Sequence, residues 1–336
     1  MLLDGFARLA FGHATDPRVA PPKATHADSR RLRLGLVLGG GAARGWAHIG
    51  VLHVLEEAGL RPDVIAGSSI GAVVGGCYAA GKLAALEAFA RTLTKRRIMG
   101  LLDFHIAGSG LIGGDRLRKL LDMDLGDQRI EDLGIRFASV ATELTTGHEI
   151  WLTRGALVEA LAASYALPGI FDPVRVGGRW LMDGALVNPV PVTVARALGA
   201  DLVVCVNLNA EIRLRGTVIQ TPAPDEVVEA VSEEQGTRRF FGGATKRRSG
   251  APGIAAVMID AFNITQDRIS RSRLAGDPPD VMVAPKLQQI GLFEFHRAAE
   301  CIERGAEAAR RVLPDIREVL GAASAARNPD AQAVAM

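Results

Sequence analysis

The sequence contains few cysteines, little net charge and no metal-binding motif. Its three cysteines (Cys77, Cys205 and Cys301) lie far apart and form no CxxC pair, which favours buried free thiols in a reducing compartment. The net charge of +2 is too small to indicate a nucleic acid as partner. There is no HExxH motif and no clustered set of ligand residues, so we expect neither a metal nor a cofactor.

The sequence also lacks the pattern of a secretory signal or a membrane span. Met1–Ala10 carries an early acidic residue and has neither a basic start nor an apolar run. The segment Val64–Gly81 is uncharged, but glycines and serines interrupt it, whereas a span needs about 20 strongly apolar residues. We interpret it as a buried strand followed by a helix. The expected location is the cytoplasm, with peripheral contact at the inner membrane face as a further expectation.

Strand-like and helix-like segments alternate along most of the chain, which predicts an α/β fold. We expect a layered, mostly parallel central sheet with helices on both faces. Strands are expected at 32–38, 64–66, 136–142, 149–152, 174–176, 179–182, 202–207 and 281–284. Helices are expected at 44–58, from 70 through 80, and at 83–97, 115–123, 156–165, 254–274, 293–312 and 316–320.

Composition divides the chain into five stretches. Residues 1–30 read as a flexible tail and residues 31–210 as the main α/β core. Residues 211–250 are polar and without periodicity, which predicts a mobile basic loop or insertion. Residues 251–322 resume a helical pattern and are expected to complete the same domain, and residues 323–336 read as a disordered tail.

Gly67-Ser68-Ser69-Ile70-Gly71 matches the G-x-S-x-G pattern of a nucleophile elbow. In such an elbow the serine occupies a strained strand-to-helix turn, small neighbours let the turn close, and the hydroxyl stays exposed. The following helix points its amino-terminal amides toward developing negative charge. The purely structural alternative is a glycine-rich turn before a buried helix. The apolar strand before Ser69 and the apolar helix after it favour the elbow.

A second glycine-rich turn, from Gly39 to Gly45, also stands between a strand and a helix. A P-loop is a poor match, because Trp46 and Ala47 stand where Lys and Ser or Thr belong, and a dinucleotide fingerprint is incomplete because Arg44 replaces its third glycine. An oxyanion hole accounts for both turns. If the two preceding strands are neighbours, the amides of the glycine loop emerge beside Ser69.

A serine nucleophile needs a base, and the sequence offers two kinds of candidate. Of the seven histidines only His296 follows Ser69 in the order of an α/β-hydrolase triad, and an ordinary position on a helix explains it better. Asp183 ends a predicted strand beside Gly184 and Ala185, where a carboxylate can approach a neighbouring hydroxyl. On the residues alone, an ordinary Asp-Gly turn remains the stronger reading of Asp183.

The order of three blocks resembles the signature of patatin-like phospholipases. The blocks are Gly-Gly-Gly-Ala-Ala-Arg-Gly (39–45), Gly-Ser-Ser-Ile-Gly (67–71) and Asp-Gly-Ala (183–185). Two further stretches, 163–171 and 186–191, are similar to the bacterial branch related to neuropathy target esterase. The resemblance covers residues 33 to 210 well and Val281 to Gly305 more weakly.

This resemblance implies a fold related to the α/β-hydrolase architecture and a Ser/Asp dyad in place of a triad. By position, Ser69 is the implied nucleophile and Asp183 the implied base. The resemblance also implies that Gly39, Gly40 and Gly41 form the oxyanion hole. It places four further residues in supporting positions: Arg44, Gly67, Gly71 and Gly184. The third block commonly reads Asp-Gly-Gly, so Ala185 departs from it, which matters only if that position requires a positive φ. Only the catalytic module is implied.

The implied reaction is acyl transfer from phospholipid or lysophospholipid esters through an acyl-enzyme. A basic stretch with two aromatic residues predicts docking on anionic headgroups, with an ordinary solvated loop as the equal alternative. Its basic residues are Arg238, Arg239, Lys246, Arg247 and Arg248. Two rival functions are a membrane-associated regulatory or scaffold protein of the same fold with weak hydrolysis, and a nucleotide-binding oxidoreductase.

Overall fold

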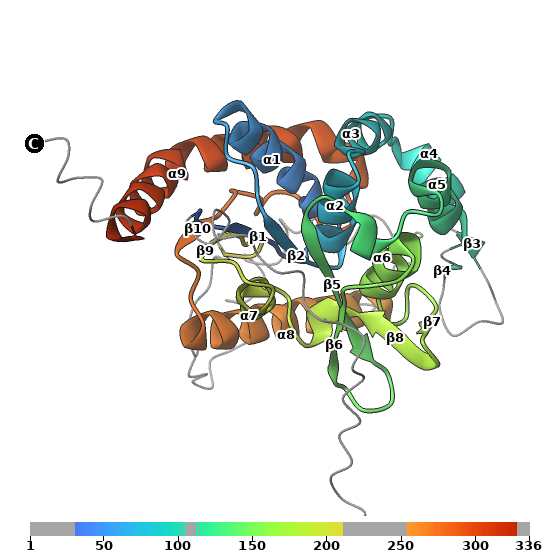
Figure 1. Ribbon diagram of the computed structural model, residues 1–336. Helices are drawn as coiled ribbons and strands as arrows, with labels where there is room; N and C mark the ends of the chain where they lie inside the picture. Colours follow the sequence, from blue (N-terminus) through green and yellow to red (C-terminus); the bar gives the residue numbers. More distant parts are fainter. Residues whose placement is uncertain (1–30, 102, 105–111, 114, 211–253, 328–336) are drawn as a thin grey trace, which may run out of the picture. The chain divides into compact units, whose positions relative to one another are not determined.

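The fold is built on one mixed sheet, seen in the computed structural model in Figure 1. The structure describes residues 31–101, 103–104, 112–113, 115–210 and 254–327. Strands follow the order β10-β9-β1-β2-β5-β8-β7, with β6 paired to β5. The five strands from β10 to β5 run parallel, and the pairs β5–β6, β5–β8 and β7–β8 are antiparallel. The expected sheet of mostly parallel strands is confirmed.

The central strands β1, β2 and β9 are mostly apolar because helices cover both faces of the sheet. Every residue of β1, β2 and β9 is buried. The strands are β1 (Leu34–Leu38), β2 (Val64–Ser68), β5 (Arg136–Glu143), β6 (Glu149–Leu152), β7 (Val174–Val176), β8 (Arg179–Asp183), β9 (Leu202–Val206) and β10 (Val281–Val283). A separate pair is formed by β3 (Asp103–Phe104) and β4 (Ile112–Gly113).

The helices lie in two layers, as expected (Figure 1). One layer packs α1, α2, α3, α6 and α9 into the larger core, and the other places α7 over β1, β2 and β9. The helices are α1 (Ala47–Glu57), α2 (Ile70–Ala79), α3 (Leu83–Arg91), α4 (Lys95–Leu101), α5 (Asp115–Leu125), α6 (Leu157–Tyr165), α7 (Val192–Ala197), α8 (Ile254–Gly276) and α9 (Ala298–Arg327). Short 3-10 turns are η1 (Ala42–Trp46), η2 (Ile130–Asp132), η3 (Gly184–Leu186) and η7 (Phe295–Arg297).

Three of the expected helices are divided or joined differently in the structure. The helix expected over 83–97 is divided into α3 and α4, because Thr94 accepts a hydrogen bond from the Arg97 amide and caps a new helix. The two helices expected over 293–312 and 316–320 are one, since α9 continues through Pro314 to Arg327.

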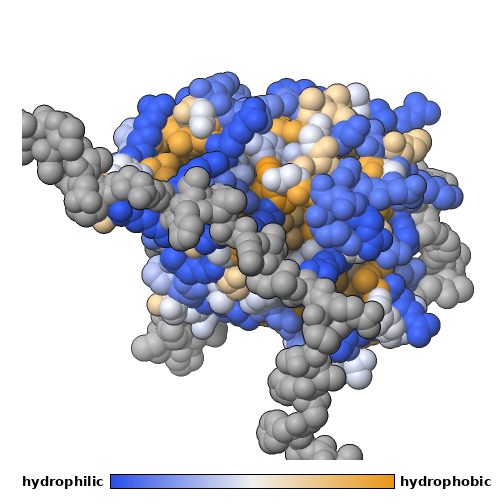
Figure 2. Space-filling view, viewed as in Figure 1, coloured by the Kyte–Doolittle hydropathy of each residue, from blue (hydrophilic) through white to orange (hydrophobic). Residues whose placement is uncertain are grey.

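Residues Leu32–Ala323 form one unit, in which β10 pairs with β9 of the same sheet as β1. The amino-terminal tail and the basic stretch at 211–250 lie outside the described residues, as do residues 328–336 of the expected carboxyl-terminal tail. Within the described part of the chain, no helix is both long enough and apolar enough to cross a membrane. The face in Figure 2 is mostly hydrophilic, with separate hydrophobic patches.

Candidate active site

Ser69 occupies a strained turn between β2 and α2. Its backbone has φ 55 and ψ −126, and among the described residues Ala42 is the one other non-glycine residue with a positive φ. A Cβ on Gly67 would lie 2.5 Å from the backbone of Ala72, and a Cβ on Gly71 would collide with the Leu38 carbonyl oxygen. Both flanking glycines are therefore needed for the turn to close against the sheet.

The Ser69 hydroxyl donates a hydrogen bond to Asp183, although the two residues are far apart in sequence. The distance from Ser69 Oγ to Asp183 Oδ2 is 2.6 Å, and Asp183 Oδ1 accepts the Ala185 amide at 2.8 Å. Asp183 ends β8 and is 1% exposed. Burial raises the pKa of Asp183 to about 7, although the hydrogen bonds from Ser69 and Ala185 act in the opposite direction. The carboxylate thus has the proton affinity of a useful general base near neutral pH.

Buried side chains that the sequence did not single out hold both partners in place. The Ser69 amide donates to Ser164 Oγ at 2.9 Å, and the Ser164 hydroxyl donates to the Val140 carbonyl at 2.6 Å. Thr142 Oγ1 donates to the backbone carbonyl of Asp183 at 2.8 Å. These bonds connect the elbow and the end of β8 to α6 and β5.

The turn at Gly184 depends on close packing. A Cβ on Gly184 would collide with the Val140 carbonyl oxygen, so a larger residue there would push the end of β8 away from β5. Ala185 does not have a positive φ, and the departure from Asp-Gly-Gly therefore causes no backbone strain.

The glycine loop lies beside Ser69 because β1 and β2 are neighbours in the sheet. A Cβ on Gly40 would be 3.6 Å from the Ser69 Cβ. The Gly39 amide already donates to the Val206 carbonyl at 3.1 Å and the Gly40 amide to the Pro189 carbonyl at 2.9 Å. Two of the three expected donors are thus occupied within the protein.

The next two amides in the loop are the available ones. Gly41 and Ala42 line the same cavity as Ser69, and within the described ranges no hydrogen bond involves either backbone N–H. Ile70 is the first residue of α2, and amides of the first helical turn have no acceptor within the helix. Donors for an oxyanion are therefore concentrated around Gly41, Ala42 and Ile70 rather than Gly39 and Gly40.

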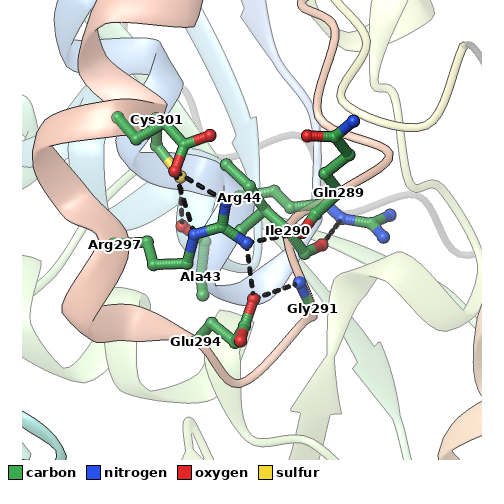
Figure 3. A network of polar contacts seen from close by, with 9 residues as sticks. Ala43, Arg44, Gln289, Ile290, Gly291, Glu294, Arg297 and Cys301 are labelled. Atoms are coloured by element: carbon green, nitrogen blue, oxygen red, sulfur yellow. Dashed lines mark hydrogen bonds and ion pairs between the residues drawn. The ribbon is translucent and has the colours of Figure 1, made fainter. Parts of the chain in front are cut away.

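Arg44 connects the glycine loop to the chain that precedes α9 (Figure 3). Its Nε donates to the Ile290 carbonyl at 2.8 Å and its Nη1 to Asn209 Oδ1 at 3.2 Å. Burial lowers the pKa of Arg44 from its ordinary value, yet the guanidinium stays charged. The Ala43 amide donates to the Leu292 carbonyl at 2.9 Å. The supporting position of Arg44 is a structural clamp behind the loop.

None of the histidines in the described ranges is a partner of the Ser69 hydroxyl. His296 does not line the cavity that contains Ser69, and burial lowers its pKa. His53 Nε2 is hydrogen-bonded to Glu87 Oε2 at 2.6 Å. His48 Nε2 lies 2.8 Å from the Gly39 carbonyl oxygen, behind the glycine loop. Among the residues that the structure describes, therefore, no Ser–His–Asp arrangement forms at this site.

Ser69 and Asp183 face an apolar cavity of about 230 Å³. Its wall follows α2 from Ser69, with Ile70, Val73 and Cys77 along one side of the helix. Other helices and the segments between them supply further apolar side chains, including Leu86, Phe89, Leu121, Tyr165, Phe171, Phe262 and Leu292. Such a wall suits a hydrocarbon chain and offers little to a polar ligand.

Comparison with known proteins agrees with the family resemblance found in the sequence. A family model described as patatin-like phospholipase matches residues 36–196. The "uncharacterized NTE family protein Rv1063c" of Mycobacterium tuberculosis is 32% identical over 84% of this chain and 91% of its own length. The chain belongs to the patatin-like phospholipase family. Membership of this family indicates a lipid acyl hydrolase.

Mouse patatin-like phospholipase domain-containing protein 6 is also similar to this family member. It is 32% identical over 55% of this chain and 15% of its own length. The crystal structure of VipD from Legionella pneumophila resembles the fold with a TM-score of 0.45 and 13% identity, covering 85% of this chain and 67% of VipD.

The part of this patatin-like chain that matches the family model contains the glycine loop, Ser69 and Asp183. Phe262, Gln266 and Leu292 complete the cavity wall from beyond residue 196. Motif spacing found the first group because its chemistry requires fixed residue types. The wall requires only apolar bulk, which leaves no comparable pattern in sequence.

Proposed function

We propose that this protein is a serine esterase that hydrolyses acyl esters of phospholipids or lysophospholipids, with Ser69 as nucleophile and Asp183 as general base. The observation that supports this most strongly is the 2.6 Å hydrogen bond from Ser69 Oγ to Asp183 Oδ2 at the wall of an apolar cavity. A hydroxyl so placed transfers its proton directly to the carboxylate as it attacks.

The proposed reaction has two halves. Ser69 Oγ bonds to the ester carbonyl carbon while its proton passes to Asp183. The oxyanion that forms accepts hydrogen bonds from the amides of Gly41, Ala42 and Ile70. The alcohol then leaves with the proton from Asp183, which yields an acyl-enzyme. In the second half, Asp183 takes a proton from water, the hydroxide attacks the acyl carbonyl, and Ser69 recovers its proton as the fatty acid departs.

Hydrolysis of lysophospholipid and of short p-nitrophenyl esters tests this proposal. Wild type should show turnover, and Ser69→Ala and Asp183→Asn should each lower kcat by about 10³-fold or more. Equal turnover in all three proteins would contradict the dyad. Detectable vesicle binding with turnover no higher than that of Ser69→Ala would instead favour the regulatory or scaffold alternative.

We also propose peripheral contact with anionic membrane through the basic stretch that precedes α8. Its residues lie outside the described ranges, so the support is the sequence alone: five basic residues and no acidic one from Gly236 to Gly250. Basic residues near an anionic surface contribute about 1 kcal/mol each. Neutralising Lys246, Arg247 and Arg248 should reduce co-sedimentation with phosphatidylserine vesicles, and unchanged co-sedimentation would reject this contact.

A further inference from the structure

The peptide unit between Gly39 and Gly40 is held at both of its polar ends. Its carbonyl oxygen lies 2.8 Å from His48 Nε2, and its N–H donates to the Pro189 carbonyl at 2.9 Å. Rotation of this peptide plane would break both hydrogen bonds in a buried environment, which is costly. The amides of Gly41 and Ala42 follow immediately, so their direction depends on this fixed plane.

The hydrogen bond to Gly39 determines the state of His48. A carbonyl oxygen can only accept, so Nε2 must carry the proton and Nδ1 is the bare nitrogen of the neutral ring. His48 is 0% exposed, and its Nδ1 has no hydrogen-bond partner in the described part of the chain. Burial lowers the pKa of His48 to about 4, so the ring is neutral at ordinary pH.

His48 lies outside the space that a substrate occupies. It is absent from the wall of the cavity, and its one donor is already bound to the loop. It therefore cannot serve as the base for Ser69. Its position at the start of α1, directly after η1, places the imidazole behind the glycine loop instead.

We propose that His48 is a positioning residue for the oxyanion hole: its Nε2–H holds the Gly39 carbonyl so that the amides of Gly41 and Ala42 stay directed at the ester carbonyl bound at Ser69. This assignment rests on the proposed function. It gives His48 a role in transition-state stabilisation without contact to the reacting atoms.

The test compares His48→Leu, which removes the donor, with His48→Gln, whose side-chain amide can restore it. His53→Leu is the matched control, because it makes the same change on the same helix at a half-exposed site. Each protein is assayed with p-nitrophenyl butyrate and with its thiono analogue. Sulfur accepts hydrogen bonds weakly, so the ratio of oxo to thiono rates reports on the amides of the oxyanion hole.

His48→Leu should lower kcat for the oxo ester by about 10-fold to 100-fold with little change in KM, which is less than the loss of a direct oxyanion donor. The oxo-to-thiono ratio should fall with it. His48→Gln should recover most of the rate and the ratio, and His53→Leu should behave as wild type. If His48→Leu does not fold, His48→Asn, whose shorter amide leaves Gly39 unpaired, should show the same loss of ratio.

Two results would overturn the assignment of His48. One is a folded His48→Leu with the kcat and the ratio of wild type. The other is an equal loss on both esters that His48→Gln does not relieve, which would indicate a general packing role. Absence of Ser69-dependent hydrolysis in wild type would be a different failure, since it would contradict the proposed function and this assignment with it.

Discussion

At the scale of single residues, the site combines a strained serine with a carboxylate of raised proton affinity. Ser69 keeps its unusual φ because the turn is fixed by tight packing on both flanks. Asp183 keeps a high pKa because it is buried with few donors. The folded structure stabilises both against their intrinsic preferences, as is typical of reactive sites.

The pKa of Asp183 predicts the pH dependence of catalysis. As a base it must be ionised, so kcat/KM in the wild type should rise as pH passes through about 7 and then level off. Measuring kcat/KM for a p-nitrophenyl ester between pH about 5 and 9 checks this. A flat profile across that range would be inconsistent with Asp183 as the base.

The same pKa predicts that stability falls over the pH range in which kcat/KM rises. A carboxyl whose pKa is raised on folding contributes stability at low pH, and this is lost as pH rises through about 7. Asp183→Asn should therefore raise the free energy of unfolding by a few kcal/mol at pH about 8, and by less at pH about 5. Urea unfolding at the two pH values measures this, and no difference between them would argue against a buried, ionising Asp183.

Ser164 predicts a separation of activity from stability. Ser164→Ala removes the acceptor of the Ser69 amide and should lower kcat by about 10-fold while costing about 1–3 kcal/mol of stability. Ser139→Ala is the matched control, because Ser139 is equally buried and donates to the Ala160 carbonyl away from Ser69. The control should lose similar stability and keep its kcat. Equal kcat in the two variants would show that Ser164 does not position the turn at Ser69.

At the scale of elements, apolar strands were predicted well because burial on both faces leaves a clear hydrophobic run. Helix boundaries were predicted less well. The break at Thr94 depends on one capping bond, and the helix end expected at residue 312 is absent because α9 continues through Pro314. Packing of the Ile316 side chain, which is 0% exposed, offsets the local cost of a proline inside α9.

That cost makes α9 a place where stability can be gained. Pro314→Ala restores a backbone donor within the helix and should stabilise the protein by about 1–3 kcal/mol, because Pro314 is exposed and little packing is lost. Thermal unfolding monitored by circular dichroism is the measurement. A lower Tm for this variant would mean that the proline ring stabilises a bend that α9 needs.

The wall along α2 predicts a change of chain-length preference. Val73→Trp fills the cavity one helical turn from Ser69 and should lower kcat/KM for a hexadecanoyl ester by about 10-fold or more, since overpacking costs roughly 1–3 kcal/mol. A butyryl ester, which does not extend so far, serves as the internal control and should be hydrolysed almost as before. Equal losses on both esters would place the acyl chain elsewhere.

At the scale of the whole molecule, the sequence predicted the residues of the site better than its surroundings. Ser69, Asp183 and the glycine loop stand in motifs whose chemistry demands fixed spacing. The cavity wall and the loop clamp at Arg44 unite segments more than 150 residues apart, and their side chains contribute only bulk or single hydrogen bonds. The proposal that Gly41 and Ala42 are the oxyanion donors depends on the carbonyls of Val206 and Pro189, which occupy the amides of Gly39 and Gly40. No local sequence pattern reveals these two contacts.

The central claim is that Ser69 is the nucleophile, and covalent labelling tests it most directly. A fluorophosphonate probe followed by peptide mass spectrometry should modify Ser69 alone. Ser68→Ala is the matched control, because Ser68 is the buried neighbour whose hydroxyl has no partner in the described part of the chain. Labelling should persist in Ser68→Ala and disappear in Ser69→Ala. Labelling that survives in Ser69→Ala at the wild-type rate would contradict the account.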